Sequence, residues 1–346
     1  MPLSPNTVIE DRYVITRPLK TGGMGTIYAA VDRRLGETPC ALKELLNREG
    51  EEDQALVLRK FEEEMRILAT LNHPGIPRVH DYFMHDGTRY IVMDLVDGQN
   101  LEELLQDSLT NRGRPLLPTQ VATYALQILE VLQYLHGHLP PIIHRDLKPA
   151  NVILEKNTQR VKLVDFGLAR ALRATTGNLN QTAIASLGYA PVEQIQGRAT
   201  VRSDIYALGA SMFHLLTGSV PVPMDAGPVQ DANVEIDDEL ARVVDKATSV
   251  DESERFQSAT PMAEALLAWK EGRSTGLPRR RPGSRKTTGK LGHSTLKRLT
   301  SPPEPASGSG EASMPVPTLV TSRTGPIRRP PKVRWLLAVA SVVLLG

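Results

Sequence analysis

The segment Ile142–Gly167, IIHRDLKPANVILEKNTQRVKLVDFG, constrains the fold of this chain more than any other stretch of it. It contains two apolar runs, Val152–Leu154 and Val161–Val164, which have the composition of β-strands and flank a polar turn, so they predict a hairpin. Asn151 and Asp165 stand at opposite ends of that hairpin. Pairing of the strands would bring these side chains together, and their hard oxygen atoms suit Mg²⁺.

The same segment carries two motifs that identify a family. His-Arg-Asp-Leu-Lys-Pro-x-Asn at His144–Asn151 is followed by Asp-Phe-Gly at Asp165–Gly167. Together they resemble the catalytic loop and the metal-binding loop of eukaryotic-like (Hanks-type) serine/threonine protein kinases of the bacterial membrane-tethered type. The resemblance covers about residues 10–271. It implies an α+β, two-lobed protein kinase fold, with a small β-rich N-lobe and a larger helical C-lobe.

The resemblance also implies roles in the transfer of the γ-phosphoryl group of ATP to Ser and Thr hydroxyls of proteins, a reaction that depends on positioning and charge neutralisation. Asp146 would orient the attacking hydroxyl and accept its proton. Lys148, which is typical of the serine/threonine branch, would neutralise charge on the transferred group. Asn151 and Asp165 would hold Mg²⁺, or Mn²⁺ in its place. Phe166 and His144 would pack against the loop.

A glycine-rich turn near the N-terminus is flanked by sequences that alternate like strands, at Tyr13–Leu19, Thr26–Val31 and Pro39–Lys43. Glycines allow backbone N–H groups to approach phosphate oxygens because no Cβ intervenes. Compared with the kinase pattern G-x-G-x-x-G-x-V, the chain has Lys20 at the first glycine. This departure would stiffen the loop or add charge near the nucleotide.

The resemblance further implies an ATP site between the lobes, with Lys43 on the α- and β-phosphates and backbone contacts to adenine from the residues after Met93. The predicted ATP contacts are Leu19, Lys20, Thr21, Gly22, Gly23, Gly25, Ile27, Ala41, Lys43, Met93, Asp94, Val96 and Ile153.

Residues 51–71 carry apolar side chains at a spacing of three or four, which predicts an amphipathic helix. By its offset from the following Leu-Asn-His-Pro, Glu64 is the best match to the glutamate that pairs with Lys43 in catalysis. Glu63 is the alternative, since the register is inferred without an alignment.

The later part of the chain has mainly helical patterns after a predicted strand at Tyr90–Val96. Helices are predicted at Thr119–His136, from Ser203 to near Gly218, at Asp238–Thr248 and at Pro261–Trp269. Strands followed by helices, rather than alternating with them, favour an α+β class.

Leu168–Ala185 is polar and lacks apolar periodicity, which predicts a mobile loop. A phosphate on this loop could pair with Arg145, next to Asp146, and order the segment. The phosphorylation candidates are Thr182, Thr176 and Thr175, of which Thr182 is preferred as an activating autophosphorylation site. A homodimer would serve such autophosphorylation. The alternative is an unregulated surface threonine.

Three further residues are assigned to structure rather than to chemistry. Glu193 ends the Pro-Val-Glu sequence that stands where the family has Ala-Pro-Glu. The resemblance implies that it forms a buried ion pair with Arg255. Asp204 would anchor the catalytic loop through backbone hydrogen bonds.

The net charge of +2 conceals two oppositely charged parts. Residues 1–271 contain 27 Lys and Arg against 37 Asp and Glu, whereas residues 272–346 contain 14 against 2. The single cysteine, Cys40, excludes an intramolecular disulfide and suits a reducing compartment. The N-terminus lacks a secretory signal pattern. These features predict a kinase domain in the cytoplasm.

The resemblance to protein kinases, together with the composition of the C-terminal part, divides the chain into four segments. Residues 1–11 are predicted as an N-terminal extension, and residues 12–271 as the kinase domain, with an N-lobe at about 12–97 and a C-lobe at about 98–271. Residues 272–334 are predicted as a basic, Pro/Ser-rich disordered linker. Residues 335–346 are predicted as the start of a transmembrane helix at which the sequence stops.

The last segment, Trp335–Gly346, is uncharged and apolar, but 12 helical residues span only about 18 Å. The basic residues before it fit the cytoplasmic side of a membrane span. Tethering to the cell membrane is therefore predicted, and no specific nucleic acid is expected as a partner. The alternative is an apolar patch that docks on the kinase domain.

Two alternative functions fit parts of the sequence. A pseudokinase, a nucleotide-responsive scaffold without transfer, is suggested by Lys20 and by Pro-Val-Glu, but the presence of Lys43, Asp146, Asn151 and Asp165 favours catalysis. A small-molecule phosphotransferase is disfavoured by Lys148 and by the threonine-bearing loop. The G-x-x-x-x-G-K-[ST] motif of P-loop nucleotidases is absent from the sequence.

Overall fold

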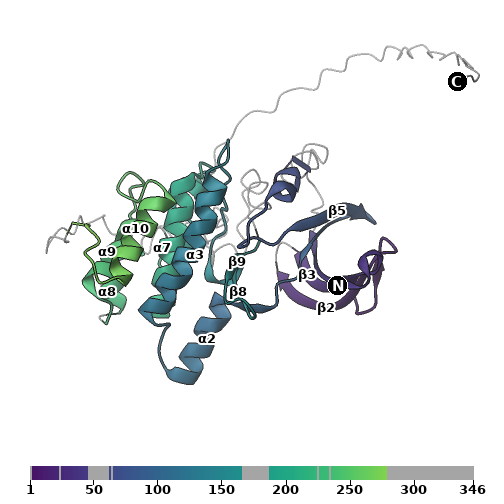
Figure 1. Cartoon of the computed structure of the whole chain (residues 1–346), viewed down its shortest axis with the longest axis horizontal. Helices are drawn as coiled ribbons and strands as arrows, with labels where there is room; N and C mark the ends of the chain where they lie inside the picture. Colours follow the sequence, from purple (N-terminus) through teal and green to yellow (C-terminus); the bar gives the residue numbers. More distant parts are fainter. Residues whose placement is uncertain are drawn as a thin grey trace, which may run out of the picture. The chain divides into compact units, whose positions relative to one another are not determined.

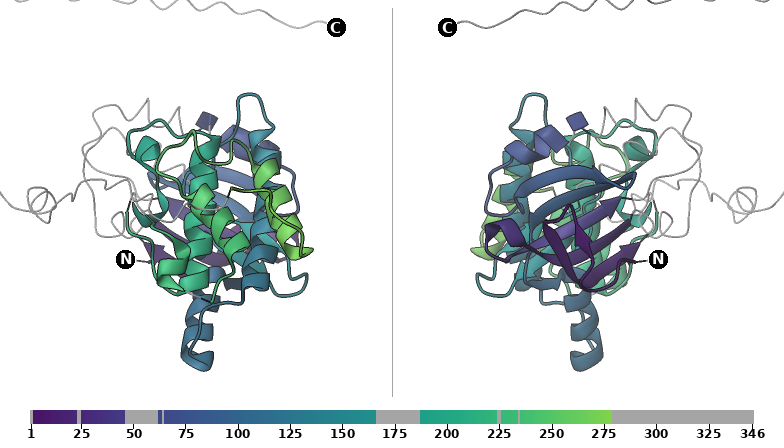
Figure 2. Two further views of the ribbon diagram at one scale, coloured as in Figure 1. Left: turned by 90° about the vertical axis from the view of Figure 1, so that its left-hand side faces the viewer. Right: turned by 90° about the vertical axis from the view of Figure 1, so that its right-hand side faces the viewer.

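The structure is a computed structural model that describes residues 2–22, 25–45, 62–63, 65–165, 187–223, 226–233 and 235–278. A β-sheet built from the N-terminal residues lies beside a bundle of helices built from the later residues (Figure 1; two further views in Figure 2). The predicted order of strands followed by helices is therefore confirmed.

The N-terminal sheet has six antiparallel strands in the order β1-β2-β3-β4-β6-β5. Side chains that alternate along the strands, including Tyr13, Ile15, Tyr28 and Leu42, are buried in a core on one face. The strands are β1 (Val8–Ile9), β2 (Tyr13–Gly22), β3 (Gly25–Asp32), β4 (Thr38–Leu45), β5 (Val79–His85) and β6 (Thr88–Asp94).

Residues 2–11 contribute to this sheet. Within them β1 pairs with β2, and the backbone amide of Leu3 donates a hydrogen bond to the hydroxyl of Tyr28 at 2.9 Å. Leu3 also packs against the core of the sheet. This segment therefore covers part of the sheet core.

The three N-terminal strands predicted from alternation are confirmed, but the prediction for the strand Tyr90–Val96 was wrong at its end. In the structure β6 ends at Asp94, which pairs with Cys40 of β4. The β4–β6 ladder ends at this pair, although β4 itself continues through Pro39 to Thr38 in its pairing with β3. The chain therefore leaves the sheet two residues earlier than its composition suggests.

The predicted hairpin of the central segment is confirmed. A second sheet has the order β7-β8-β9, with β7 (Gly98–Asn100), β8 (Val152–Glu155) and β9 (Val161–Leu163). The amide of Val164 donates to the carbonyl of Asn151 at 3.0 Å, so the two ends of the hairpin meet. This contact places Asp165 beside Asn151.

The helical region is packed around α7, whose residues from Ser203 to Leu216 are all buried. The helix α3 buries the predicted apolar stripe. The helices are α2 (Leu101–Arg112), α3 (Pro118–His136), α6 (Val192–Ile195), α7 (Val201–Thr217), α8 (Val229–Ala232), α9 (Asp238–Ala247) and α10 (Ala259–Lys270), with 3₁₀ turns η1 (Arg33–Leu35), η2 (Pro149–Asn151) and η3 (Leu187–Tyr189).

Some predictions fall partly or wholly outside the described residues. Of the predicted helix at 51–71, residues 62–63 and 65–71 are described, and all of these except residue 71 are helical. The loop Leu168–Ala185, most of the linker and the segment Trp335–Gly346 lie outside. Among the helices of the described part of the chain, none is long and apolar enough to cross a membrane.

Candidate active site

A single buried carboxylate holds the backbone that precedes the β8–β9 hairpin. Asp204, in the first turn of α7, accepts hydrogen bonds from the amides of His144 at 2.9 Å and Arg145 at 3.0 Å. Its Oδ2 also lies 2.9 Å from Nε2 of His136. Arg145 has φ of +65°, a strained conformation that costs about 1–3 kcal/mol. The contacts to Asp204 offset this strain and fix the approach to Asp146.

Asp146 lies in a short network of polar side chains. Nδ2 of Asn151 donates to Oδ2 of Asp146 at 2.8 Å and to its backbone carbonyl at 2.9 Å. Nζ of Lys148 lies 3.0 Å from Oδ2 and 3.3 Å from Oδ1. Because Nδ2 of Asn151 is engaged, the orientation of its amide is set and Oδ1 is the atom presented to other partners.

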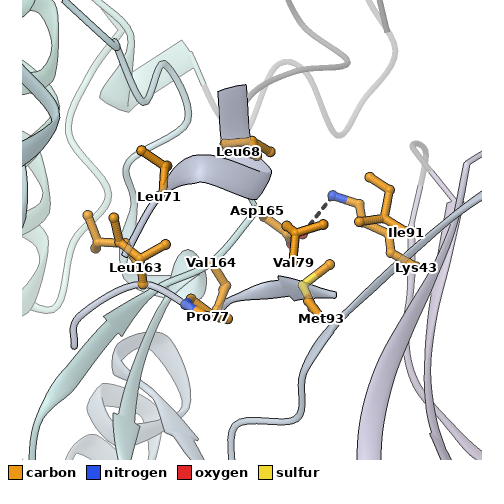
Figure 3. A pocket seen from close by; sticks show the side chains of 11 residues that line it. Lys43, Leu68, Leu71, Pro77, Val79, Ile91, Met93, Leu163, Val164 and Asp165 are labelled. Carbon is orange, nitrogen blue, oxygen red and sulfur yellow. Dashed lines mark hydrogen bonds and ion pairs between the residues drawn. The ribbon is translucent and has the colours of Figure 1, made fainter. Parts of the chain in front are cut away.

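Lys43 and Asp165 form a second charged pair. Nζ of Lys43, on β4, donates to Oδ1 of Asp165 at 2.7 Å (Figure 3). Burial by itself raises the pKa of Asp165, but the nearby ammonium groups of Lys43, Lys20 and Lys148 outweigh burial and leave the pKa below its ordinary value. Asp165 is therefore a carboxylate at neutral pH and can bind a cation.

Lys20 brings a further ammonium group to the same place from β2. The strand register is irregular between Pro18 and Lys20, and Lys20 stands opposite Ile27 of β3. Nζ of Lys20 lies 3.5 Å from Oδ1 of Asn151 and 3.9 Å from Oδ2 of Asp165. Strong charged hydrogen bonds are about 2.7–2.9 Å long, so both contacts of Lys20 are weak.

Asn151 and Asp165 fit a divalent cation of the Mg²⁺ type. Together they offer an amide oxygen and an ionised carboxylate, and Mg²⁺ is commonly held by one or two carboxylates with phosphate oxygens. A cation, the ammonium of Lys20, already lies beside both oxygens. The donor set therefore suits a metal that arrives with a polyphosphate.

A cavity of about 30 Å³, more than the roughly 10–15 Å³ that one water molecule needs, adjoins the charged pair. Lys43, Met93 and Asp165 contribute to its wall, and the rest is mainly apolar, including Leu68 and Ile91 (Figure 3). Met93, one of the predicted ATP contacts, lies next to the pair that would hold the phosphates and the metal.

Comparison with known sequences decides the family. Residues 13–282 match the family described as protein kinase domain, and this match covers more than half of the chain. The chain belongs to the protein kinase family.

The kinase is similar to curated bacterial proteins. It is 32% identical over 357 residues to the serine/threonine-protein kinase PknB of Mycolicibacterium smegmatis, covering 97% of this chain and 54% of that protein. It is also 32% identical over 268 residues to the serine/threonine-protein kinase PrkC of Bacillus subtilis, covering 73% of this chain and 40% of that protein. The kinase thus spans about half the length of these relatives.

Solved structures confirm the predicted fold class. The kinase superposes on the PknI kinase domain of Mycobacterium tuberculosis with a TM-score of 0.61 at 27% identity, covering 78% of this chain and all of that domain. It superposes on the apo form of PpkA-294 with a TM-score of 0.65 at 25% identity, covering 77% and 99%. The six-stranded sheet is the N-lobe, and the helical region is the C-lobe.

The predicted ATP contacts of the kinase lie on neighbouring strands of the N-lobe and on the β8–β9 hairpin. Ile27 stands opposite Lys43, and Ala41 stands opposite Met93, in the strand register. β2 ends with Leu19, Lys20, Thr21 and Gly22, and β3 contains Gly25 and Ile27. β4 contains Ala41 and Lys43, and β6 ends with Met93 and Asp94. Val96 lies in the connection to β7, and Ile153 lies on β8.

Several predicted site residues lie outside the described residues. They include Glu64, the predicted partner of Lys43, and Gly23 of the glycine-rich turn. The undescribed residues also include Phe166, Gly167 and the phosphorylation candidates Thr175, Thr176 and Thr182. Within the described residues, Lys43 pairs with Asp165.

Glu193 and Arg255 form a bidentate buried ion pair in the C-lobe. The distances are 2.7 Å from Nη1 to Oε1 and 3.3 Å from Nη2 to Oε2. Ser203 also donates to Oε1 at 2.9 Å, and Arg255 lies over the ring of Tyr206. Burial raises the pKa of Glu193, but the hydrogen bonds from Arg255, the backbone and Ser203, together with the charge of Arg255, outweigh burial and leave the pKa lowered.

Two side chains that support the predicted catalytic loop were not predicted from the sequence. Gln194, next to Glu193 on α6, donates from Nε2 to the carbonyl of Arg145 at 2.8 Å. His136 contacts Asp204 from the end of α3. Nothing in the local sequence signals either contact, because both partners are distant along the chain.

Gly25 has a conformation that only glycine adopts without strain. Its φ is +135°, and a Cβ there would lie 1.8 Å from the carbonyl oxygen of Glu44. We expect Gly25→Ala to lower the free energy of unfolding by about 1–3 kcal/mol and to weaken ATP binding, because the start of β3 must shift. Urea unfolding and nucleotide titration measure both effects.

The matched control is Gly22→Ala, because a Cβ at Gly22 meets nothing within 4 Å. We expect the free energy of unfolding of this variant to stay within about 0.5 kcal/mol of wild type. Equal losses in the two variants would contradict the steric explanation.

Proposed function

We propose that this chain is an ATP- and Mg²⁺-dependent protein serine/threonine kinase that acts in bacterial signal transduction. The observation that carries this proposal is the proximity of two charged networks at the end of the β8–β9 hairpin, where Lys20 lies beside a member of each. One is Asp146 with Lys148 and Asn151, and the other is Lys43 with Asp165. They join a proton acceptor, a metal-binding pair and two phosphate-binding cations.

The chain's own residues divide the work of phosphoryl transfer. Asp146 accepts the proton of the attacking Ser or Thr hydroxyl at a carboxylate oxygen, and Lys148 balances the negative charge near that oxygen. Lys43 orients Asp165 and binds the phosphates. Asn151 and Asp165 would hold Mg²⁺, which would supply neutralisation of the phosphate charge.

The nature of the acceptor distinguishes this proposal from a small-molecule phosphotransferase. The kinase is incubated with γ-labelled ATP, Mg²⁺ and a mixture of protein substrates, and the labelled amino acids are identified after hydrolysis. Label on phosphoserine and phosphothreonine supports the proposal. Label only on phosphotyrosine or on small molecules would contradict it.

The second candidate function is a nucleotide-responsive scaffold that transfers no phosphate. The observation that favours it is the ammonium of Lys20 beside Asn151 and Asp165, where a metal would otherwise be held. A scaffold binds ATP and shows no transfer at any Mg²⁺ concentration, whereas a kinase shows transfer that rises with Mg²⁺.

Autophosphorylation is the regulation that we propose for this kinase. Arg145 directly precedes Asp146, and a phosphate on Thr182 would gain a charge-assisted contact with its guanidinium. We expect Thr182→Ala to abolish the lag and rise in activity that a dephosphorylated enzyme shows on incubation with Mg·ATP. The variants Thr175→Ala and Thr176→Ala are the controls. An unchanged time course in Thr182→Ala would contradict this role.

The basic linker and the segment Trp335–Gly346 support a further proposal, tethering of the cytoplasmic kinase domain to the cell membrane. The apolar segment follows four basic residues and contains no charge, as the positive-inside rule predicts for a cytoplasmic flank. Membrane fractionation tests this proposal, and full recovery of the intact chain in the soluble fraction would contradict it.

A further inference from the structure

Lys20 connects the glycine-rich turn to the predicted metal ligands. Its Nζ lies 3.5 Å from Oδ1 of Asn151 and 3.9 Å from Oδ2 of Asp165. The side chain of Lys20 is 50% exposed, whereas that of Asp165 is 17% exposed. A solvent-facing cation of the N-lobe therefore extends to a partly buried anion at the edge of the C-lobe.

Two ammonium groups share the carboxylate of Asp165, one beside each oxygen. Lys43 holds Oδ1 at 2.7 Å, in the position of a strong charged hydrogen bond. Lys20 approaches Oδ2 and, at the same time, Oδ1 of Asn151. Because Lys43 occupies Oδ1 of Asp165, a metal ion would bind Oδ2 of Asp165 and Oδ1 of Asn151. These are the two oxygens that Lys20 approaches.

We propose that Lys20 is an intramolecular cation that competes with the divalent metal for Asn151 and Asp165 in the nucleotide-free kinase. A metal ion bound to both oxygens would repel the ammonium, and the ammonium weakens metal binding for the same reason. This inference rests on the proposed function, because it assumes that these two residues hold the metal.

The contact of Lys20 is one that a nucleotide can replace. A half-exposed ion pair at 3.9 Å is weak, so the side chain can move away. A polyphosphate brings negative charge to the same place, and the released ammonium can pair with it. Lys20 therefore opposes metal binding in the absence of nucleotide and favours it in the presence of nucleotide. Metal binding and nucleotide binding are thereby coupled.

The test compares wild type with Lys20→Met, which removes the charge and keeps a side chain of similar length. Binding of Mn²⁺ in the absence of nucleotide is measured by electron paramagnetic resonance, as a decrease in the signal of unbound Mn²⁺. We expect Lys20→Met to bind Mn²⁺ about fivefold more tightly than wild type, the upper end of what a half-exposed ion pair contributes. Binding of Mg·ADP, followed by calorimetry, is expected to weaken by about threefold.

Two variants serve as controls. Arg17→Met removes the same charge from an exposed position on the same strand and should leave both affinities within about twofold of wild type. Lys20→Arg keeps the charge and should bind Mn²⁺ as weakly as wild type does. Circular dichroism checks the fold, and Lys20→Gln replaces Lys20→Met if that variant is unfolded.

The outcomes separate this inference from the proposed function. Equal Mn²⁺ affinity in wild type and Lys20→Met overturns the inference, and so does an equal gain in Arg17→Met, which would indicate a general effect of charge. If wild type binds Mg·ADP and transfers phosphate in these cases, the proposed function stands. A wild-type kinase that binds no Mg·ADP overturns both.

Discussion

Asp146→Asn is expected to lower kcat by about 10²–10⁴-fold, the usual contribution of a positioned proton acceptor. The amide is nearly the same size as the carboxylate, but it cannot accept the proton of the attacking hydroxyl. Asn151 can still donate to the backbone carbonyl of residue 146, so the loop should keep its conformation. Affinity for Mg·ATP is expected to change by less than about threefold, because Lys43 and Asp165 are untouched.

The matched control is Asp86→Asn in the turn between β5 and β6. Asp86 has a side chain that is 93% exposed and a positive φ of 48° that asparagine tolerates. Steady-state kinetics should show wild-type activity for this variant. Retention of more than about a tenth of the wild-type kcat in Asp146→Asn would contradict the assigned role of Asp146.

Arg255→Met is expected to lower the free energy of unfolding by about 3–5 kcal/mol, because it strands the buried charge of Glu193. The side chain of Arg255 is 1% exposed and that of Glu193 is 10% exposed, so water cannot replace the lost partner. Urea unfolding at pH 7 measures the loss. The control is Arg273→Met, which removes an exposed pair with Glu271 and should change the free energy by less than about 1 kcal/mol.

The destabilisation in Arg255→Met should shrink as the pH falls. The folded-state pKa of Glu193 lies below its ordinary value of 4.5, so the pair contributes its full stability above that value and loses it as the pH falls through the folded pKa. In the variant, burial without a partner raises the pKa of Glu193, and protonation then removes the stranded charge. A loss that is constant from pH 7 to pH 4 would contradict this explanation.

The central segment was predictable from sequence because its contacts are local. The hairpin follows from the two apolar runs and the turn between them, and pairing of Val152 with Leu163 fixes the ends. That pairing brings Asn151 to Asp165. The roles of these residues came from the family motifs, since alternation alone identifies no chemistry.

Contacts between distant segments were not predictable in the same way. The sequence shows that Lys20 departs from the glycine pattern, but its contact with Asn151 depends on how the N-lobe approaches the C-lobe. His136 and Gln194 likewise support the catalytic loop from other elements.

Secondary structure was missed where local signals were weak or unused. The strand β5 is at the edge of the sheet and partly exposed along its length, so its apolar pattern is faint. The helix α2 has a clearer signal that could have located it. Asn100 and Glu103 form a capping box at its start, which is a sequence signature of a helix N-terminus.

The most direct test of the central claim is a single-turnover reaction of the folded kinase with ATP labelled at either the γ- or the α-phosphate, in the presence of Mg²⁺. We predict that γ-label appears on protein Ser and Thr, that α-label does not, and that removal of Mg²⁺ with a chelator stops the reaction. A wild-type protein that binds Mg·ATP tightly but transfers no γ-label would contradict the claim and identify the chain as a scaffold.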